Sequence, residues 1–413
     1  MVHFERHTLG NGLRVLCHQD LQTPMVCVNV LYDVGARDES PHRTGFAHLF
    51  EHLMFSGSVN IPQYDHHVEF AGGENNAFTN NDITNYYLTL PASAVETAFW
   101  LESDRMLGLA FSEKGLEVQK GVVVEEFRQR YLNQPYGDAW LLLRDLAYSV
   151  HPYRWPTIGL HPSHIEEAEM EEVRAFYARF YNPDNAVLAV AGNVKPDVVF
   201  RLAEKWFGGI PSGPVQRRDL PAEPPQMAER RKEVLRDVPA NALYLAWHMV
   251  PRMHPDYYSH DLLSDILSAG NSSRFFNRLV KRRALFSELT AYVTGDLDRG
   301  LFVVTGKVAQ GVDPWDAERA VLAELHELAG ASVQEEELRK VQNKAESLLA
   351  FSELSLAERA LNLAYFELQG DAATYNGQGE AYRRVNAEAV RSTAASLFLP
   401  QGTSTLHILS QPG

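Results

Sequence analysis

The stretch GFAHLFEHLMFSGS, Gly45 to Ser58, combines the apolar periodicity of a packed helix with three titratable side chains. On a helical wheel, His48, Glu51 and His52 fall on one side, opposite the apolar residues. The predicted packing face consists of Phe46, Leu49, Phe50 and Leu53. Placing three titratable groups on such a helix is costly unless something compensates them, and one bound dication compensates all three.

Two histidines four residues apart on a helix can both reach one zinc ion, at about 2.0–2.1 Å from each ring nitrogen. Glu51 then lies near the metal without having to ligate it. A catalytic zinc site takes a third protein ligand, and the helical stretch FSEKGLEVQKGVVVEEFRQRY offers Glu125 and Glu126. Glu126 flanks the packed face of this helix, whereas Glu125 lies nearly opposite, so Glu126 is the predicted ligand. Without the two histidines, the alternative that Glu125 and Glu126 are both ordinary surface residues would be an equally good interpretation.

Length and composition limit the function classes. A chain of 413 residues is long enough for two or more domains. Its net charge of −15 argues against nucleic-acid binding, which requires basic patches. No apolar window reaches the length of a membrane helix, and the first residues do not form a signal peptide. We therefore expect a cytoplasmic protein without a membrane span.

A proline-rich break divides the chain, with five prolines between Pro211 and Pro225. The predicted domains are an N-terminal metal-binding domain (1–212), a linker (213–228) and a homologous C-terminal domain without metal ligands (229–413). The predicted strands are 13–17, 25–32, 83–91, 186–194, 242–250, 287–295, 300–308 and 403–410. Both halves show the same order of strands and helices, which indicates an internal duplication. The expected class is α+β: two homologous α/β domains, each a mainly antiparallel sheet packed against helices.

Two other pairs of residues are candidate metal ligands by type. Cys17 and Cys27 lie in strand-like apolar runs, so they are expected to be buried small hydrophobes rather than a metal or disulfide pair. His66 and His67 are adjacent, and neighbouring helical positions point in different directions. They are expected to be surface residues rather than a second metal site.

Several ordered motifs resemble the HxxEH (inverzincin) zinc metallopeptidase family, which includes pitrilysin, insulin-degrading enzyme and mitochondrial processing peptidase. The motifs are LGNGLRVL, VLYDVGARDESPHRTGFAHLFEHLMFSGS, GGENNAFTNNDITNYY, VVVEEFRQR, HPYRWPTIG, YNPDNAVLAVAGNV and SAGNSSRFFNRLVKRRAL. The resemblance implies that His48, His52 and Glu126 hold one Zn²⁺ per chain. It also implies that Glu51 is the general base that activates water for peptide-bond hydrolysis.

The resemblance assigns two further groups of residues. Asn76, Ala77 and Phe78 match an edge strand that pairs with the backbone of the peptide substrate. Gln119 stands where the family usually has a second glutamate, which supports the metal ligands without touching the metal. An amide can still donate a hydrogen bond, so this departure affects zinc affinity rather than the ligand set.

A second departure concerns substrate binding by the second half. Many family members carry an arginine and a tyrosine seven residues apart, and the matching positions here are Val280 and Ser287. Arg274, Arg278, Arg282 and Arg283 have no tyrosine seven residues further on. The chain therefore resembles the metal-bearing subunit of the bacterial two-subunit members. We expect a heterodimer with a homologous zinc-free subunit that supplies the arginine and tyrosine, and a homodimer is the alternative.

Three functions remain open from the sequence. The first is a zinc-dependent endopeptidase that hydrolyses peptides or unfolded polypeptide segments inside a chamber closed by the second subunit. The second is a non-catalytic structural or assembly subunit of a larger complex, against which the intact set of His48, Glu51, His52 and Glu126 argues. The third is a dedicated precursor-processing peptidase, which the sequence does not separate from the first.

Overall fold

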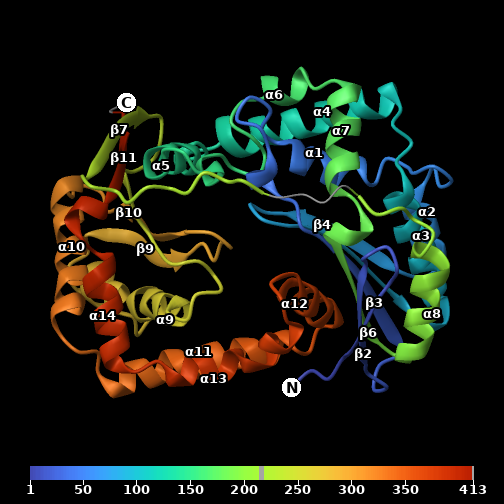
Figure 1. Ribbon diagram of the computed structural model, residues 1–413. Coiled ribbons are helices and arrows are strands. Elements are labelled where there is room, and N and C mark those ends of the chain that lie inside the picture. The colour runs from blue at the N-terminus through green and yellow to red at the C-terminus, as the bar shows by residue number, and fades with distance from the viewer. Residues whose placement is uncertain (214–217, 412–413) are drawn as a thin grey trace. The chain divides into compact units, whose positions relative to one another are not determined.

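The computed structural model describes residues 1–213 and 218–411, which form two compact units (Figure 1). Unit 1 comprises Met1–Phe127, Pro156–Leu220 and Ala350–Gly377, and unit 2 comprises the remaining segments, Arg128–Trp155, Pro221–Leu349 and Gln378–Gly413. The units thus differ from the contiguous segments 1–212 and 229–413, because each contains a helical segment from the other half of the chain. Part of the predicted linker, residues 214–217, lies outside the described residues.

Unit 1 is built on a six-stranded sheet in the order β1-β2-β6-β3-β5-β4. Its strands are β1 (Glu5–Thr8), β2 (Arg14–Gln19), β3 (Met25–Tyr32), β4 (Glu74–Thr79), β5 (Thr84–Pro91) and β6 (Ala186–Gly192). Only the β2–β6 pair is parallel; the other pairs are antiparallel. The central strands β3 and β6 are almost fully buried, as their apolar runs require. β4 lies at the edge of the sheet and pairs only with β5.

Helices cover both faces of this sheet. The helices of unit 1 are α1 (Phe46–Leu53), α2 (Tyr64–Phe70), α3 (Val95–Leu107), α4 (Glu113–Phe127), α6 (Ser163–Glu166), α7 (Met170–Phe180), α8 (Pro196–Phe207) and α12 (Leu356–Leu368). In Figure 1, α3 and α8 lie against one face and α12 against the other. Ala360 and Ala364 of α12 pack against Ala189 and Ala191 of β6. These small side chains allow the helix to approach the sheet closely.

Unit 2 repeats this strand order without the first strand. Its strands are β7 (Arg230–Arg236), β8 (Ala242–His248), β9 (Phe286–Val293), β10 (Leu301–Val308) and β11 (Ser404–Ser410), in the order β7-β11-β8-β10-β9. The one parallel pair of unit 2 is β7–β11, which corresponds to the parallel pair β2–β6 of unit 1. The predicted fold class, two homologous and mainly antiparallel α/β units, is therefore confirmed.

The sheet of unit 2 is also covered on both faces. The helices of this unit are α5 (Ala139–Ala147), α9 (Tyr257–Ser268), α10 (Pro314–Gly330), α13 (Gln378–Arg384) and α14 (Ala387–Leu397), and α11 (Glu335–Ser352) continues from unit 2 into unit 1. In Figure 1, α5 and the layer of α9, α10 and α14 lie on opposite faces. Ala139, Leu143 and Ala147 of α5 follow helical spacing and pack against Ala242 and Ala246 of β8.

The two cysteines lie on β2 and β3, and the adjacent histidines His66 and His67 lie on α2. Cys17 and Cys27 are buried and unbridged, as predicted, and burial raises the pKa of each thiol to about 12. His66 is exposed, and the half-buried His67 packs edge-on against Trp100 with ring centroids 4.9 Å apart. Among the described residues, none of the helices combines the length and the apolar composition needed to cross a bilayer.

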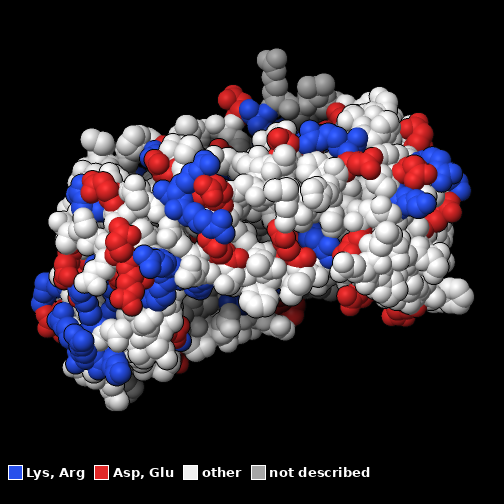
Figure 2. Space-filling view, turned by 90° about the horizontal axis from the view of Figure 1, so that it is seen from below, with Lys and Arg blue, Asp and Glu red and all other residues white. Residues whose placement is uncertain are grey.

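Acidic and basic side chains lie next to one another over the face shown in Figure 2. Arg391 and Glu388, whose side chains are 34% and 64% exposed, form one such surface ion pair. Such pairs contribute little to stability, because solvent screens them. The net charge of the chain is thus accompanied by extensive local pairing of opposite charges.

Candidate metal centre

Helix α1 places its apolar face against the rest of unit 1. Phe46, Leu49, Phe50 and Leu53 are all buried, which confirms the predicted packing face. The ring of Phe50 stacks between Phe176 of α7 and Tyr181, with centroid distances of 5.1 and 5.2 Å. This packing fixes the rotation of α1 about its axis, so its titratable face is held toward α4 and β4.

The N-terminus of α1 is capped from outside the helix. Its N-cap residue, Gly45, has a left-handed backbone (φ 93°) and no side chain to accept a hydrogen bond. Instead, both carboxylate oxygens of Glu39 accept backbone N–H bonds, from Gly45 and Ala47, each at 2.8 Å. A carboxylate here satisfies two helix donors and interacts favourably with the helix dipole. The sequence did not reveal this role, because Glu39 lies six residues before the N-cap, outside any capping-box spacing.

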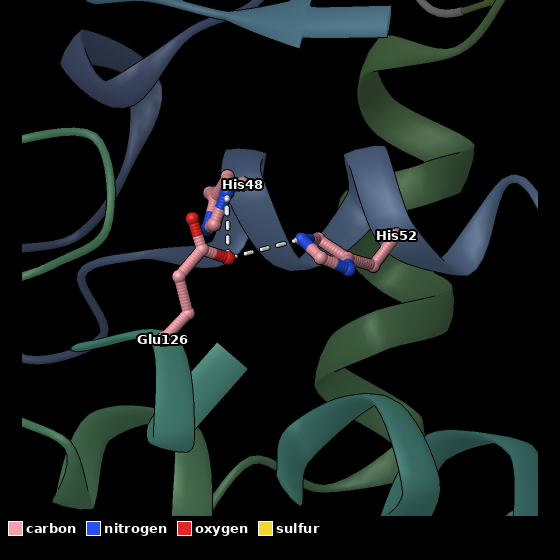
Figure 3. A group of neighbouring side chains, drawn as sticks. All are labelled: His48, His52 and Glu126. Carbon is pink, nitrogen blue, oxygen red and sulfur yellow. Dashed lines mark ion pairs between the residues drawn. The ribbon is translucent and has the colours of Figure 1, made fainter. Parts of the chain in front are cut away.

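The structure brings His48, His52 and Glu126 together (Figure 3). The Nε2 atoms of His48 and His52 lie 3.7 and 3.5 Å from the same oxygen, Oε2 of Glu126. One ligand atom from each of the three residues lies within 4.8 Å of the other two. Their side chains are 11%, 24% and 21% exposed, so solvent reaches the cluster without surrounding it.

This donor set fits a zinc ion. Two imidazole nitrogens and a carboxylate oxygen are a known zinc ligand set, and zinc bonds of about 2.0–2.2 Å place neighbouring tetrahedral ligand atoms about 3.4 Å apart. The observed separations of 3.5 and 3.7 Å are close to that value. A single negative charge on three ligands leaves a bound dication with a net positive charge. Within the described residues, no other group of three histidine, cysteine, aspartate or glutamate side chains has its ligand atoms within 4.8 Å of one another.

The other polar residues assigned to the site have different positions. Glu51 lies on α1, one residue before His52, and is half-buried. On α4, Glu126 is half-buried whereas Glu125 is exposed, so Glu126 is the glutamate next to the imidazoles. Gln119 is half-buried on α4, two helical turns before Glu126.

The stretch matched to a substrate strand is β4 at the sheet edge. Asn76, Ala77 and Phe78 pair with β5 on one side only. The backbone N–H of Ala77 donates to Oδ1 of the Asn76 side chain at 2.8 Å. β4 lies beside α1, so the open edge and the metal cluster belong to the same part of unit 1.

The two positions that lack the family's arginine and tyrosine are in unit 2. Val280 lies in the π-helix η6 (Phe276–Arg282) and packs against the core of that unit. Ser287 lies on the edge strand β9, where its hydroxyl donates to the carbonyl of Lys307 at 3.3 Å. Neither side chain provides a positive charge or an aromatic hydroxyl.

Comparisons with known proteins relate the whole chain to one family of peptidases. Residues 14–143 match a family described as "Insulinase (Peptidase family M16)", and residues 168–345 match "Peptidase M16 inactive domain". A relative named zinc protease PqqE, from Helicobacter pylori, is 29% identical over 82% of this chain and 77% of its own length. The crystal structure of a protease from Helicobacter pylori has a TM-score of 0.92 and 26% identity, with both chains fully covered.

A further solved structure, the periplasmic protease PqqL from Escherichia coli, shares the fold with a TM-score of 0.79 and 19% identity. The present chain covers 98% of its own length but 47% of that protein. The chain belongs to the M16 peptidase family, several of whose members are named zinc proteases. His48, His52 and Glu126 all lie within the segment that matches the insulinase description rather than the inactive domain.

Proposed function

We propose that this chain is a zinc-dependent endopeptidase that cuts peptides or unfolded polypeptide segments. The observation that carries the proposal is the convergence of His48, His52 and Glu126, with Glu51 on the same helix face as the two histidines. A buried or half-buried cluster of this composition is costly without a cation. A polypeptide that had lost metal chemistry would have no physical reason to retain it.

In this proposal, His48, His52 and Glu126 hold one Zn²⁺. When bound, zinc supplies Lewis-acid chemistry, because it polarises a carbonyl group and makes water more acidic. The carboxylate of Glu51 accepts the proton of the attacking water and returns it to the leaving amine, as a general base and then a general acid. The half-buried position of Glu51 on the same helix as the two histidines supports this role.

Strand β4 supports the assignment of a polypeptide substrate. Among the described residues of unit 1, its outer edge has no strand partner, so an extended peptide can add to the sheet through main-chain hydrogen bonds. The backbone N–H of Ala77 donates to the neighbouring Asn76 side chain, and it can donate to a carbonyl of a bound peptide instead. Binding of this kind depends weakly on side chains, which fits an enzyme of broad specificity.

We further propose that the active form is a heterodimer with a homologous zinc-free subunit. Val280 and Ser287 provide neither the arginine nor the tyrosine with which relatives hold substrate. The E. coli protease of similar fold has a chain about twice as long, and this chain covers 47% of it. A second two-unit chain would make up the difference. A homodimer would supply the length but not the missing side chains.

A non-catalytic assembly role is the competing function, and one observation favours it. Residues 168–345, nearly half of the chain, match a family described as inactive. That segment excludes His48, His52 and Glu126; it covers the last part of unit 1, from α7 to α8, and most of unit 2. The assembly role predicts that the chain neither binds zinc tightly nor cleaves peptides.

The decisive experiment compares wild type, Glu51→Gln and Glu125→Gln for zinc content and cleavage of an unstructured peptide. Each protein is measured alone and with a homologue that carries arginine and tyrosine seven residues apart. We expect about one zinc per chain in all three, and cleavage by wild type and Glu125→Gln only with the homologue. Glu51→Gln should lose about 10²–10⁴-fold in rate, the typical contribution of a general base.

Three results would contradict parts of this proposal. Absence of zinc from wild type would support the assembly role. Full cleavage by the chain alone would exclude the obligatory heterodimer. Cleavage of one precursor, and of no member of a random peptide library, would identify a dedicated processing peptidase.

A further inference from the structure

The loop that leads from β3 to α1 is joined closely to the turn that connects β4 and β5. Main-chain N–H groups of Ala36 and Arg37 donate to the carbonyls of Asn80 and Asn81, at 3.1 and 2.9 Å. At Gly35, an added Cβ would lie 2.5 Å from the carbonyl of Asn81, so any larger residue would separate the two segments. The loop and the turn are therefore packed directly against each other.

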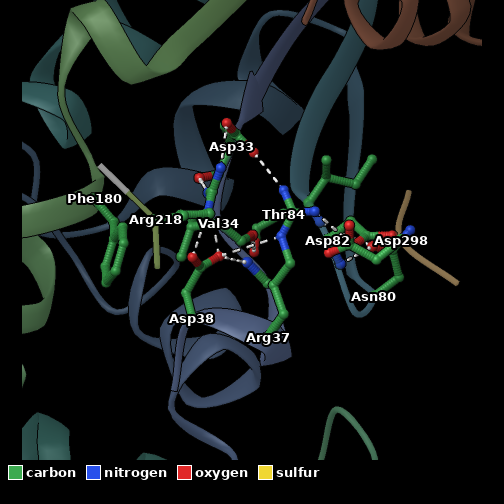
Figure 4. A network of polar contacts seen from close by, with 12 residues as sticks. Asp33, Val34, Arg37, Asp38, Asn80, Asp82, Thr84, Phe180, Arg218 and Asp298 are labelled. Carbon is green, nitrogen blue, oxygen red and sulfur yellow. Dashed lines mark hydrogen bonds and ion pairs between the residues drawn. The ribbon is translucent and has the colours of Figure 1, made fainter. Parts of the chain in front are cut away.

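The side chain of Arg37 strengthens this junction. It is 6% exposed, and it donates from Nη1 to Oδ1 of Asp82 at 2.9 Å and from Nη2 to Oδ1 of Asp33 at 3.0 Å (Figure 4). Asp82 belongs to the β4–β5 turn and its side chain is 5% exposed. A guanidinium shared between two carboxylates holds both in a defined geometry, which an ammonium group would not do.

The same loop also fixes α1. Two residues beyond Arg37, Glu39 binds the first N–H groups of α1, as described above. A path of short contacts thus leads from the β4–β5 turn through Arg37 and Glu39 to the helix that carries His48 and His52. It connects the segment after the open strand β4 with the helix that carries two of the three candidate metal ligands.

Arg218 contacts the same loop from its other side. Nε and Nη1 of Arg218 lie 2.5 Å from Asp38 and 2.6 Å from Asp33, and Nη2 donates to the Asp33 carbonyl (Figure 4). Its hydrogen bonds reach Asp33 and Asp38 but, among the contacts of the described residues, not the β4–β5 turn. Arg218, whose side chain is 24% exposed, thus offers a comparison: an arginine ion-paired with the same loop but without a direct link to the strand.

We propose that Arg37 is a positioning residue that aligns a strand-bound peptide on β4 with the metal cluster on α1. This proposal rests on the proposed peptidase function. If it is right, loss of the Arg37–Asp82 contact leaves the metal ligands and the open edge of β4 intact but misaligns one with the other. Peptide binding and metal binding then change little, while the chemical step slows.

The test uses Arg37→Met, Asp82→Asn and Arg218→Met in the full chain with its partner. For Arg37→Met and Asp82→Asn we expect kcat to fall by about 10–100-fold, in line with the cost of a misplacement of about 1 Å. KM and zinc affinity should stay within about threefold of wild type, because the groups that bind peptide and metal are unchanged. Arg218→Met should keep kcat within about threefold. Asp82→Asn retains the volume of the side chain, so it decides the outcome if Arg37→Met does not fold.

Hydrogen exchange of the β4 and β5 amides provides a readout that does not depend on activity. We expect faster exchange at residues 79–84 in Arg37→Met and Asp82→Asn, and wild-type exchange there in Arg218→Met. Equal losses of kcat in the Arg37 and Arg218 variants, or a rise in KM at constant kcat, would overturn the proposal. An inactive wild type with the expected exchange pattern would instead count against the peptidase function alone.

Discussion

Helix α1 of unit 1 and helix α9 of unit 2 occupy equivalent places in two sheets of the same strand order. α1 lies beside the edge strand β4, and α9 lies beside the edge strand β9. Each helix is followed by a glycine with a left-handed backbone, Gly57 (φ 107°) and Gly270 (φ 72°). Counting back from these glycines, His48 corresponds to Asp261, His52 to Asp265, and Glu51 to Ser264.

The polar side chains of the two helices have different kinds of partners. In unit 2, Oδ2 of Asp261 accepts a hydrogen bond from Tyr382 at 2.5 Å, and Oδ1 of Asp265 lies 2.8 Å from Nζ of Lys344. Burial raises the pKa of Asp261, and the bond from Tyr382 offsets part of this rise. The chain itself thus supplies the donors and the positive charge. In unit 1 the corresponding positions hold two of the three donors that could bind an external cation, and the proposed Zn²⁺ would supply the positive charge that Lys344 supplies in unit 2.

The largest effect should follow from removing a ligand in unit 1. We expect Glu126→Gln to lower zinc affinity by more than about 100-fold, the upper end for residues that only orient a ligand. Glu125→Gln, one residue away and exposed, should retain wild-type zinc. The measurement is zinc content after dialysis against a graded series of chelator concentrations. If Asp261→Asn or Asp265→Asn lowered zinc content as well, the distinction between the two helices would fail.

Acid should lower the free energy of unfolding of unit 2 through the half-buried His248. Burial lowers the pKa of His248 to about 4, from an ordinary value of 6.5. Below pH 6.5 the unfolded chain takes up a proton that the folded unit does not accept until about pH 4. The free energy of unfolding should therefore decrease as pH falls through this window, by about 1.4 kcal/mol per pH unit.

Substitution of His248 by phenylalanine should reduce this slope, leaving the part due to His260, whose pKa burial also lowers; substitution of the exposed His326 should leave the slope unchanged. Hydrogen exchange of β8 amides in urea, measured between about pH 7 and pH 5, follows unit 2 separately from unit 1. An unchanged slope in His248→Phe would show that another group controls the acid response.

A smaller effect is expected from the internal donor of α9. Tyr382→Phe removes the hydroxyl that donates to Asp261, a carboxyl group in a largely buried position. We expect a loss of about 1–3 kcal/mol in the free energy of unfolding, the range for a hydrogen bond to a charged or buried partner. Urea unfolding measures the loss, and Tyr258→Phe, whose ring packs against Tyr382, is the control. A loss of the same size in the control would assign the effect to packing.

The smallest effect concerns the exposed ion pair of the same helix. Lys344 is 45% exposed and Asp265 is 24% exposed, so solvent screens their attraction. We expect Lys344→Met to change the free energy of unfolding by about 0–1 kcal/mol. The same unfolding measurement at low and high salt checks it. A larger loss that persists at high salt would mean that the lysine replaces the metal as a structural cation.

Local patterns predicted the elements on which the site is built. The predicted strands correspond to β2, β3, β5, β6, β8, β9, β10 and β11. The period of the apolar residues also determined which face of α1 packs and that Glu126, not Glu125, lies on the inner side of α4. These features depend on residues a few positions apart, so a helical wheel or an alternating pattern contains them.

Contacts between distant residues were not predictable in this way. Glu39 caps α1 outside any capping motif, Arg37 binds Asp82 across 45 positions, and Asp261 and Asp265 were not recognised as the counterparts of the histidines. No local rule links such residues, and in the second half the duplicated sequence has lost its similarity to the first. Only the common strand order restored the correspondence between the two helices.

The sequence by itself determined the fold class, the donor set on α1 and the third donor on α4, because each of these depends on periodicity within one helix or strand. The tertiary structure decided which sheet each helix covers. An apolar face shows that a helix is buried but not against which partner, and here α5 and α12 cover sheets formed mainly by the opposite half of the chain. The tertiary structure also decided which partners the polar side chains of α1 and α9 have, since those partners come from distant segments of the chain.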